Sequence, residues 1–380
     1  MIVSLFLILC MAIIAVPAFA ADPEQSDGGD APYGYYITSL NYKEKSLELI
    51  NPADNTTVSS MASGDKPLNV VPCPGTMNAA ILCDEEMQKI RIVNMTTKEI
   101  YANVFLLPAD KNGIGTIDDR GCVDHIFWRP DGRYLYVVTD TFLAAINGWS
   151  FQTEKCFDVV GSRVAADMTP DGSYMILFRK VRDNTYIVDR LNTDINEIDK
   201  TRTIKLDFDA TNVGPLRFSP DGKKAYAFID NMGKTGWIGV EPNLVTIDTD
   251  TLDVNITLKV LPTVKSASRT NRMDLEISPN GDHLYMLYSS NSRGSLPRAK
   301  ILGYNLKTGA YENTFYSEGR EIGAIALSPD GALIYAADYS DYWTRDNTIS
   351  VINATSGAMV KQIQTGKSPI DVKIVPRLNA

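Results

Sequence analysis

Few residues in this 380-residue sequence have side chains and spacing that suit catalysis. There are only two histidines, His125 and His283, too few for most metal sites built on imidazole. The sequence has no haem attachment motif of the Cys-x-x-Cys-His type, no Gly-x-Ser-x-Gly nucleophile motif, no phosphate-binding loop and no dinucleotide-binding glycine pattern. Acidic pairs such as Asp118-Asp119 lack the ligand spacing of a calcium loop and are interpreted as surface turns. We therefore predict no catalytic residue, no metal site and no cofactor.

Cysteines are the next reactive group, and an even number in an exported chain permits disulfides. Four follow the apolar N-terminal segment. A hairpin turn at 74–77 would place Cys83 opposite Leu68, so Cys73 and Cys83 would lie too far apart for a bond. Cys83 and Cys122 are expected at the same face of adjacent repeats, and this pair is the predicted disulfide.

Four Asn-x-Thr sequons are candidate glycosylation sites if the source organism glycosylates its exported proteins. Three of them fall in turns that we expect to be exposed. They begin at Asn55, Asn94, Asn255 and Asn353.

Basic and aromatic residues in a few polar segments are the candidate partner-binding residues. The chain has 37 Lys and Arg against 46 Asp and Glu, a net charge of −9, so a local basic excess could steer an anionic partner. Exposed aromatic rings beside arginine are typical of protein or carbohydrate contacts. The alternatives are solvated charges without a common ligand and aromatic packing of one loop against its neighbour. The candidates are Arg179, Arg182, Trp237, Arg269, Arg272, Arg293, Arg298, Tyr339, Tyr342, Trp343 and Arg345.

A repeated strand–turn–strand unit must position these residues. An apolar strand, a Pro-Asp-Gly or Pro-Asn-Gly turn and a second apolar, often Tyr-containing strand recur at Pro130, Pro170, Pro220, Pro279 and Pro329, with a degenerate copy near Pro74. Proline fixes φ near −65°, Asp or Asn caps the turn, and glycine adopts positive φ. The unit is therefore a β-hairpin.

A second marker gives an independent count of seven repeats. Each unit later contains an apolar strand that ends in Asn or Asp, a polar turn and another apolar strand. The seven occurrences are 42 to 59 residues apart, as four-stranded propeller blades with variable loops require. They are centred on Asn51, Asn94, Asn147, Asp189, Asp248, Asn305 and Asn353.

The two ends of the chain complete one another. The first unit, from Tyr33, lacks its inner strand, and residues 370–376 form an inner strand with no hairpin after it. The C-terminal strand is therefore expected to join the first blade and close the ring, which leaves no long sheet edge exposed. The predicted fold is an all-β, seven-bladed propeller of four-stranded antiparallel blades, over residues 33–380.

The repeat resembles that of the YVTN family of seven-bladed propellers. The segment from Ile325 through Ser328-Pro329-Asp330-Gly331 to Tyr335, followed by residues 349–353, is the most similar copy, and the resemblance extends over residues 33–376. It implies the fold and little about activity, because propellers host many functions. The resemblance also extends to the propeller subunits of periplasmic amine dehydrogenases, where a partner chain carries the quinone cofactor.

The order of the strands predicts which face of the propeller binds a partner. Connections alternate between the two faces, so all long connections, namely those from the second to the third strand of a blade and from one blade to the next, share one face. Long loops on a rigid scaffold are the usual place for binding. We expect a non-catalytic module that binds a protein or cell-surface glycan, possibly anionic, and no nucleic acid, which would require a basic surface. The alternatives are a subunit of a quinone-dependent amine dehydrogenase complex with a cofactor-bearing partner chain and, third, a lactonase-like enzyme.

The N-terminal segment predicts export. Residues 2–16 are almost entirely apolar, and Ala18-Phe19-Ala20 fits a signal peptidase site, so residues 1–20 are interpreted as a signal peptide and 21–32 as a flexible leader. An uncleaved membrane anchor is the alternative. Either places the folded part outside the cytoplasm, in the periplasm, at the cell surface or secreted, with no further membrane span expected.

Overall fold

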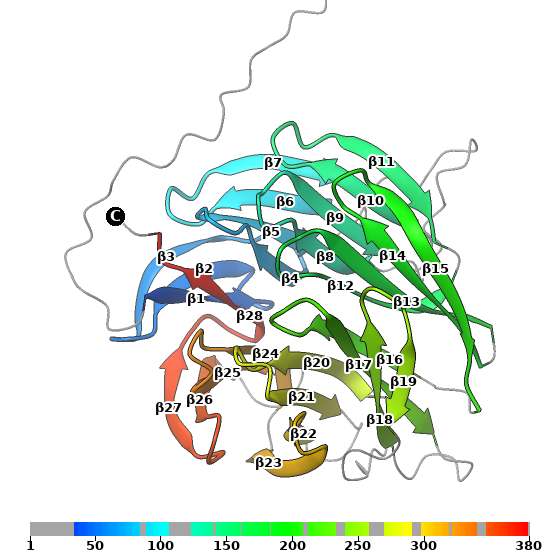
Figure 1. Ribbon diagram of the computed structural model, residues 1–380. Coiled ribbons are helices and arrows are strands. Elements are labelled where there is room, and N and C mark those ends of the chain that lie inside the picture. Colours follow the sequence, from blue (N-terminus) through cyan, green and yellow to red (C-terminus); the bar gives the residue numbers. More distant parts are fainter. Residues whose placement is uncertain are drawn as a thin grey trace, which may run out of the picture.

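The fold is an all-β propeller of seven four-stranded antiparallel sheets around a central axis (Figure 1). The computed structural model describes residues 34–83, 89–105, 123–139, 142–159, 161–182, 184–207, 212–232, 240–257, 270–290, 298–318, 321–339 and 347–378. The predicted fold class is confirmed. In the described part of the chain, no helix is long and apolar enough to cross a membrane.

Each sheet is a blade, and we number the blades from the one that contains the first strand. Blades one to three, from the axis outward, are β28 (Pro369–Pro376), β1 (Tyr35–Asn41), β2 (Ser46–Asn51), β3 (Thr56–Ala62); β4 (Pro67–Pro72), β5 (Asn78–Cys83), β6 (Lys89–Asn94), β7 (Ile100–Phe105); and β8 (Val123–Trp128), β9 (Tyr134–Thr139), β10 (Phe142–Asn147), β11 (Thr153–Asp158).

Blades four to seven follow the same order. They are β12 (Ser162–Met168), β13 (Tyr174–Arg182), β14 (Thr185–Asn192), β15 (Glu197–Lys205); β16 (Asn212–Phe218), β17 (Lys224–Met232), β18 (Val240–Asp248), β19 (Val254–Thr257); β20 (Thr270–Ile277), β21 (His283–Ser290), β22 (Arg298–Asn305), β23 (Ala310–Glu318); and β24 (Glu321–Leu327), β25 (Leu333–Tyr339), β26 (Thr348–Asn353), β27 (Met359–Gln364).

The last strand closes the ring, as predicted. β28 pairs antiparallel with β1, with Tyr36 opposite Val375 and Leu40 opposite Asp371. The backbone N–H of Arg377 donates to the carbonyl of Gly34 at 3.0 Å, so the described ends of the chain lie together at blade one.

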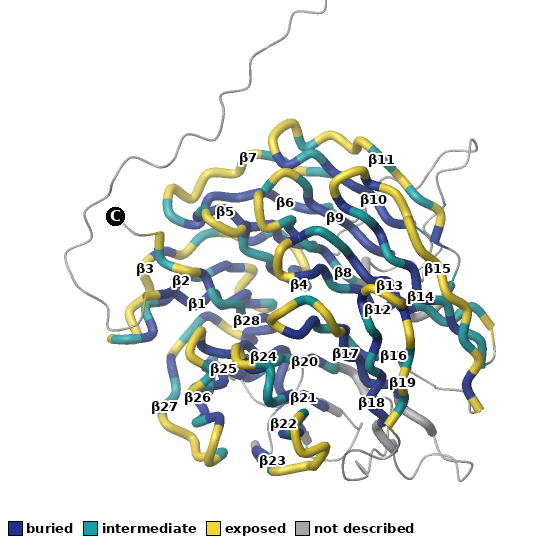
Figure 2. The backbone as a smooth tube through the Cα atoms, viewed as in Figure 1, coloured by how far each residue is buried: buried dark blue, intermediate teal, exposed yellow. Residues whose placement is uncertain are grey.

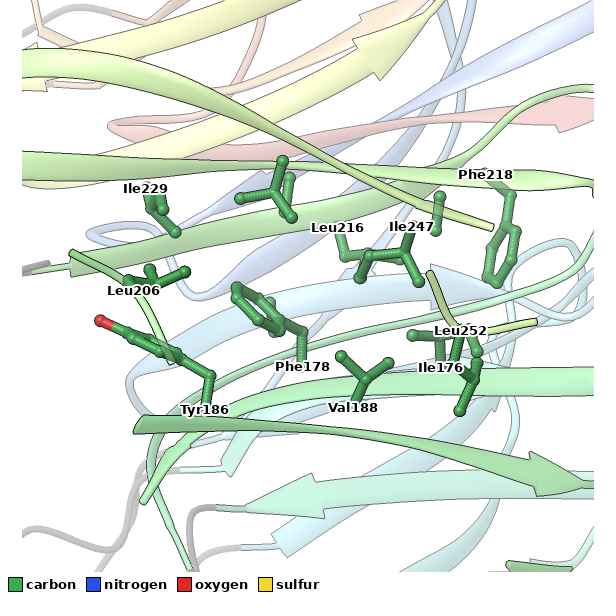
Figure 3. Close-up of a cluster of buried hydrophobic side chains, with 14 residues drawn as sticks. Ile176, Phe178, Tyr186, Val188, Leu206, Leu216, Phe218, Ile229, Ile247 and Leu252 are labelled. Atoms are coloured by element: carbon green, nitrogen blue, oxygen red, sulfur yellow. The ribbon is translucent and has the colours of Figure 1, made fainter. Parts of the chain in front are cut away.

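The core consists of apolar clusters between adjacent blades. Between blades four and five, Phe178, Tyr186 and Val188 pack against Leu216 and Ile247, all buried (Figure 3). Along the outermost strands most residues are exposed, as β15 shows (Figure 2). Burial is thus confined to the spaces between sheets, and the blades hold each other in place.

The Pro-Asp-Gly turns of neighbouring blades overlap around one face. A Cβ atom at Gly172, at φ +76°, would lie 2.4 Å from Cδ of Pro130 in the preceding blade, and one at Gly331 would lie 2.8 Å from Cδ of Pro279. Gly75, at φ +69°, has nothing within 4 Å of the same position, because blade one has chain ends where the other blades have a turn. Gly172 and Gly331 are therefore required both by the turn and by the close contact with the preceding blade.

Gly172→Ala is expected to destabilise the protein more than Gly75→Ala. Both substitutions force alanine into positive φ, which costs about 1–2 kcal/mol, but only Gly172→Ala also drives a methyl group into Pro130. We expect a further loss of about 1–3 kcal/mol from that overlap. Urea unfolding of the two variants measures the difference in stability. Equal unfolding midpoints would show that the turns of neighbouring blades make no close steric contact.

Candidate functional site

The two faces of the propeller carry connections of different length. Turns such as 219–223 and 249–253, within the first and second hairpin of a blade, lie on one face, which we call the turn face. Because the strands alternate in direction, the connections 106–122, 233–239, 258–269, 291–297 and 340–346 all start and end at the opposite face, the loop face.

Most of the predicted binding residues lie outside the described residues. These are Trp237, Arg269, Arg293, Tyr342, Trp343 and Arg345, which belong to the long connections of the loop face. Arg272 and Arg298 are placed within β20 and β22, near the ends of these strands at the same face. The candidate set therefore stays a prediction for this face.

Arg179 and Arg182, which the sequence places in the polar segments predicted to bind a partner, do not lie in a long connection. β13 continues to Arg182 and β14 begins at Thr185, so Arg179 and Arg182 belong to a strand. The Nε atom of Arg179 donates to Asp189 Oδ2 at 2.8 Å, and the two side chains are only 12% and 3% exposed. Arg179 is thus part of an internal ion pair, whereas Arg182 is exposed.

Tyr339 packs against its neighbours in the fold. It is at the end of β25, and its ring meets that of Tyr42 edge-on with centroids 6.4 Å apart. Both rings pack against the apolar cluster between blades one and two. This contact is aromatic packing within the fold, the alternative to partner binding, although Tyr339 ends a strand and only Tyr42 lies in a connection.

The predicted disulfide and glycosylation sites differ in how far their residues are exposed. Cys83 is buried, with its Sγ atom 3.4 Å from the carbonyl oxygen of Ser63, and Cys122 lies outside the described residues, so the disulfide stays a prediction. Asn55 and Asn255 are exposed, and Asn353 is half-buried. The expected exposure of Asn94 is wrong: this side chain is 2% exposed, and its Oδ1 accepts the N–H groups of Thr96 and Thr97.

The structure also brings together charged side chains near the axis, a group that the sequence reasoning did not identify. Alternate residues of the inner strands remain partly accessible, among them Val71, His125, Phe127, Asp167 and Arg217. On β8 and β16 this period of two shows that one row of side chains stays partly accessible near the axis, whereas every residue of β24 is buried. We call the interacting charged side chains of the inner strands the axial network: Asp167, Arg217, Asp274, Glu276, Asp371 and Lys373.

Three aspartates of the axial network connect adjacent blades through the main chain. In each case Oδ2 accepts a backbone N–H of the next inner strand: Asp167 from Phe218 at 3.2 Å, Asp274 from Ile325 at 3.0 Å and Asp371 from Val70 at 2.9 Å. Inner strands have one unpaired edge, and its N–H groups need acceptors when buried. The aspartates supply these acceptors between blades four and five, six and seven, and one and two.

Arg217 on β16 connects blade five to blade six through two acidic residues of β20. Its guanidinium lies 3.2 Å from Asp274 Oδ1 and 3.6 Å from Glu276 Oε1, which joins blades five and six. Lys373 Nζ lies 3.3 Å from Asp371 Oδ1 within β28. The network thus links the inner strands from blade four to blade seven and from blade one to blade two.

Burial shifts the titration of the axial acids. Desolvation raises the pKa of Glu276 to about 7 and that of Asp167 to about 6, although Arg217 opposes both shifts. Desolvation also raises the pKa of Asp371, with Lys373 opposing it. Four carboxylates face two permanent cations, so the network retains protons near neutral pH more readily than exposed acids do.

His125 lies on β8, the inner strand of blade three, and contacts blade four. Its Nε2 donates to the carbonyl oxygen of Val164 at 3.2 Å, and its ring stacks on Phe127. Burial lowers the pKa of His125 to about 4, so the imidazole is neutral at physiological pH. Within the described ranges, no group of three or more His, Cys, Asp or Glu side chains is arranged to hold a metal ion.

A signal for the axial network is present in the sequence. Charged residues interrupt apolar inner strands at alternate positions, as in Asp274-Leu275-Glu276 and Asp371-Val372-Lys373. An acid two or four residues before the first residue of a turn such as Ser278-Pro279-Asn280-Gly281 identifies Asp167, Asp274 and Glu276.

Comparison with known proteins supports the fold. No protein-family model matches the sequence, so membership of the YVTN family is not confirmed, and no curated protein was found to be a relative. A chain of hydrazine synthase from Kuenenia stuttgartiensis has a TM-score of 0.60 and 16% identity, over 83% of this chain and 91% of that chain. A functionally unknown protein from Desulfotomaculum acetoxidans has a TM-score of 0.56 and 13% identity, over 88% and 98%.

Proposed function

We propose that this protein is an exported, non-catalytic binding module of the YVTN type that holds a protein or glycan partner on its loop face. The observation that carries the proposal is the inequality of the faces: the turn face has only short turns, and the long connections all begin and end at the other face. A rigid ring with variable loops on one side is the usual design of a recognition surface.

Two further observations favour the loop face over the axis as the place of recognition. The axial aspartates are occupied by main-chain N–H groups and by cations of the same chain. On the turn face, side chains cap their own turns, as Asp221 does by accepting from Ser219 Oγ at 2.6 Å. Polar groups that already have hydrogen-bond partners within the protein contribute less free energy to binding a ligand.

A triple substitution tests the proposed face. In Trp343→Ala/Tyr342→Ala/Arg298→Ala, we expect at least a tenfold loss of affinity, because aromatic and arginine anchors dominate most interfaces. The measurement is capture of partners from a native extract, together with binding to a glycan array. The matched control is Trp149→Ala, since Trp149 is 49% exposed in the turn between β10 and β11, on the turn face. If the triple variant retains its partners while the control loses them, the loop face is not the binding surface.

A second candidate is a propeller subunit of an enzyme complex, such as a quinone-dependent amine dehydrogenase, in which another chain carries the cofactor. The observation in its favour is the fold shared with a chain of hydrazine synthase over 83% of this protein. Mass spectrometry of the native complex separates the two candidates, because only a subunit would co-purify with a cofactor-bearing chain. A dye-linked amine oxidation assay on that complex then tests the activity.

A further inference from the structure

We propose that the axial network is a proton-sensitive latch: the inner strands of blades four to seven hold together most firmly when Glu276 carries a proton. This device is independent of the proposed partner, because it concerns contacts between the blades themselves.

Glu276 differs from the three aspartates of the network. Each aspartate receives a main-chain N–H from the adjacent blade, whereas Glu276 accepts no main-chain hydrogen bond in the described part of the chain. Among the described residues its charged partner is Arg217, at 3.6 Å, and that guanidinium lies closer to Asp274, at 3.2 Å. A carboxylate that shares its cation and lacks backbone donors is the weakest ionised member of the network.

The groups around Glu276 come from every neighbouring inner strand. Asp167 on β12 and Asp274 on β20 repel its negative charge, and Arg217 on β16 and Lys373 on β28 attract it. From β24, the side chains that pack toward blade six are Ile322, Ile325 and Leu327, which are buried and carry no charge. His125 on β8 is neutral and adds no positive charge. Ionised Glu276 therefore adds a fourth carboxylate to a space with two cations.

The direction of the pH dependence follows from these surroundings. The pKa of Glu276 is about 7 in the folded protein against an ordinary value of 4.5, so its contribution to stability is complete below pH 4.5 and is lost as the pH rises through about 7. Asp167, with a pKa of about 6, acts in the same direction at lower pH. His125 acts oppositely, because its pKa is lowered to about 4 and stability is lost as the pH falls below its ordinary 6.5. Glu276 changes its charge between pH 6 and 8, because this range brackets its pKa of about 7.

Thermal unfolding of Glu276→Gln between pH 6 and 8 tests the latch. Ionisation of Glu276 is expected to lower the Tm of the natural protein by roughly 2 °C between pH 6 and 8, for a chain of this size. Glutamine resembles the protonated acid in shape and charge, so Glu276→Gln should not show this decrease. The control is Glu197→Gln, which removes an exposed acid on the outermost strand β15, where the side chain is 63% exposed. This control should keep the natural dependence on pH.

Hydrogen exchange of the unmodified protein gives a second measurement that needs no variant. After correction for intrinsic exchange rates, peptides that contain β16, β20 and β24 should be less protected at pH 8 than at pH 6, and peptides of β2 and β6 should not change. Parallel Tm curves for the natural protein, Glu276→Gln and Glu197→Gln, or uniform protection at both pH values, would overturn the proposal.

Discussion

Removal of residues 369–380 is expected to abolish the cooperative folded state. The deletion removes all of β28, including Ile370, Val372 and Val375, which are 0–1% exposed, and it leaves β1 as an unpaired inner edge. Burial of each such side chain contributes about 1.5–3 kcal/mol, so the loss approaches the whole stability of an ordinary domain, about 5–15 kcal/mol. An exposed apolar strand edge also promotes aggregation.

Circular dichroism and size-exclusion chromatography of the truncated chain measure this loss. The matched control removes only residues 379–380 and keeps all of β28, so it should unfold like the natural protein. A synthetic peptide of residues 366–378, added in trans, should restore part of the folded state by taking the place of β28. A truncated chain that unfolds cooperatively at the natural midpoint would show that ring closure is not essential.

Asp274→Leu is expected to lower the free energy of unfolding by about 3–5 kcal/mol. The substitution removes the acceptor of the Ile325 N–H at 3.0 Å, the acceptor of the Leu275 N–H at 2.9 Å and the nearer partner of Arg217. Asp274 is 7% exposed, so solvent does not readily replace these contacts. The cost comes chiefly from the groups that are left without partners.

A double-mutant cycle in urea separates these contributions. Arg217→Met/Asp274→Leu removes the buried cation together with its partner and should recover part of the loss, although the Ile325 N–H remains unpaired. Asp274→Asn keeps an acceptor oxygen and should be milder than Asp274→Leu. Equal midpoints for Asp274→Leu and the natural protein would show that the contact between blades six and seven does not depend on this carboxylate.

The sequence predicts the propeller well because its turns are local. Each Pro-Asp-Gly turn is specified by a few adjacent residues, and the structure places Gly222 at φ +70° and Gly331 at φ +72°, as such turns require. The closure by the C-terminal strand follows from counting strands at both ends. The turns depend on adjacent residues and the closure depends on the number of strands, so both can be predicted from the sequence alone.

The site is less predictable because its contacts join residues that are far apart in sequence. Arg179 belongs to a run of polar residues that resembles a loop, whereas the structure pairs it with Ile187 of β14 and joins its guanidinium to Asp189 on the same strand. Asp371 and Val70 are hydrogen-bonded across 301 positions of sequence. Charges at alternate positions of the inner strands mark candidates for the axial network, but nothing near them in sequence identifies the strand of another blade to which they bind.

The hydrogen bond between Arg377 and Gly34 has a practical consequence for engineering. Both described ends of the chain emerge at the turn face, where β28 finishes and β1 starts. A fluorescent tag, a surface-immobilisation handle or a bilayer tether attached at either end would therefore leave the opposite surface unobstructed. The same proximity makes the protein suited to circular permutation, with the old ends joined by a short linker and new ones opened in any exposed hairpin.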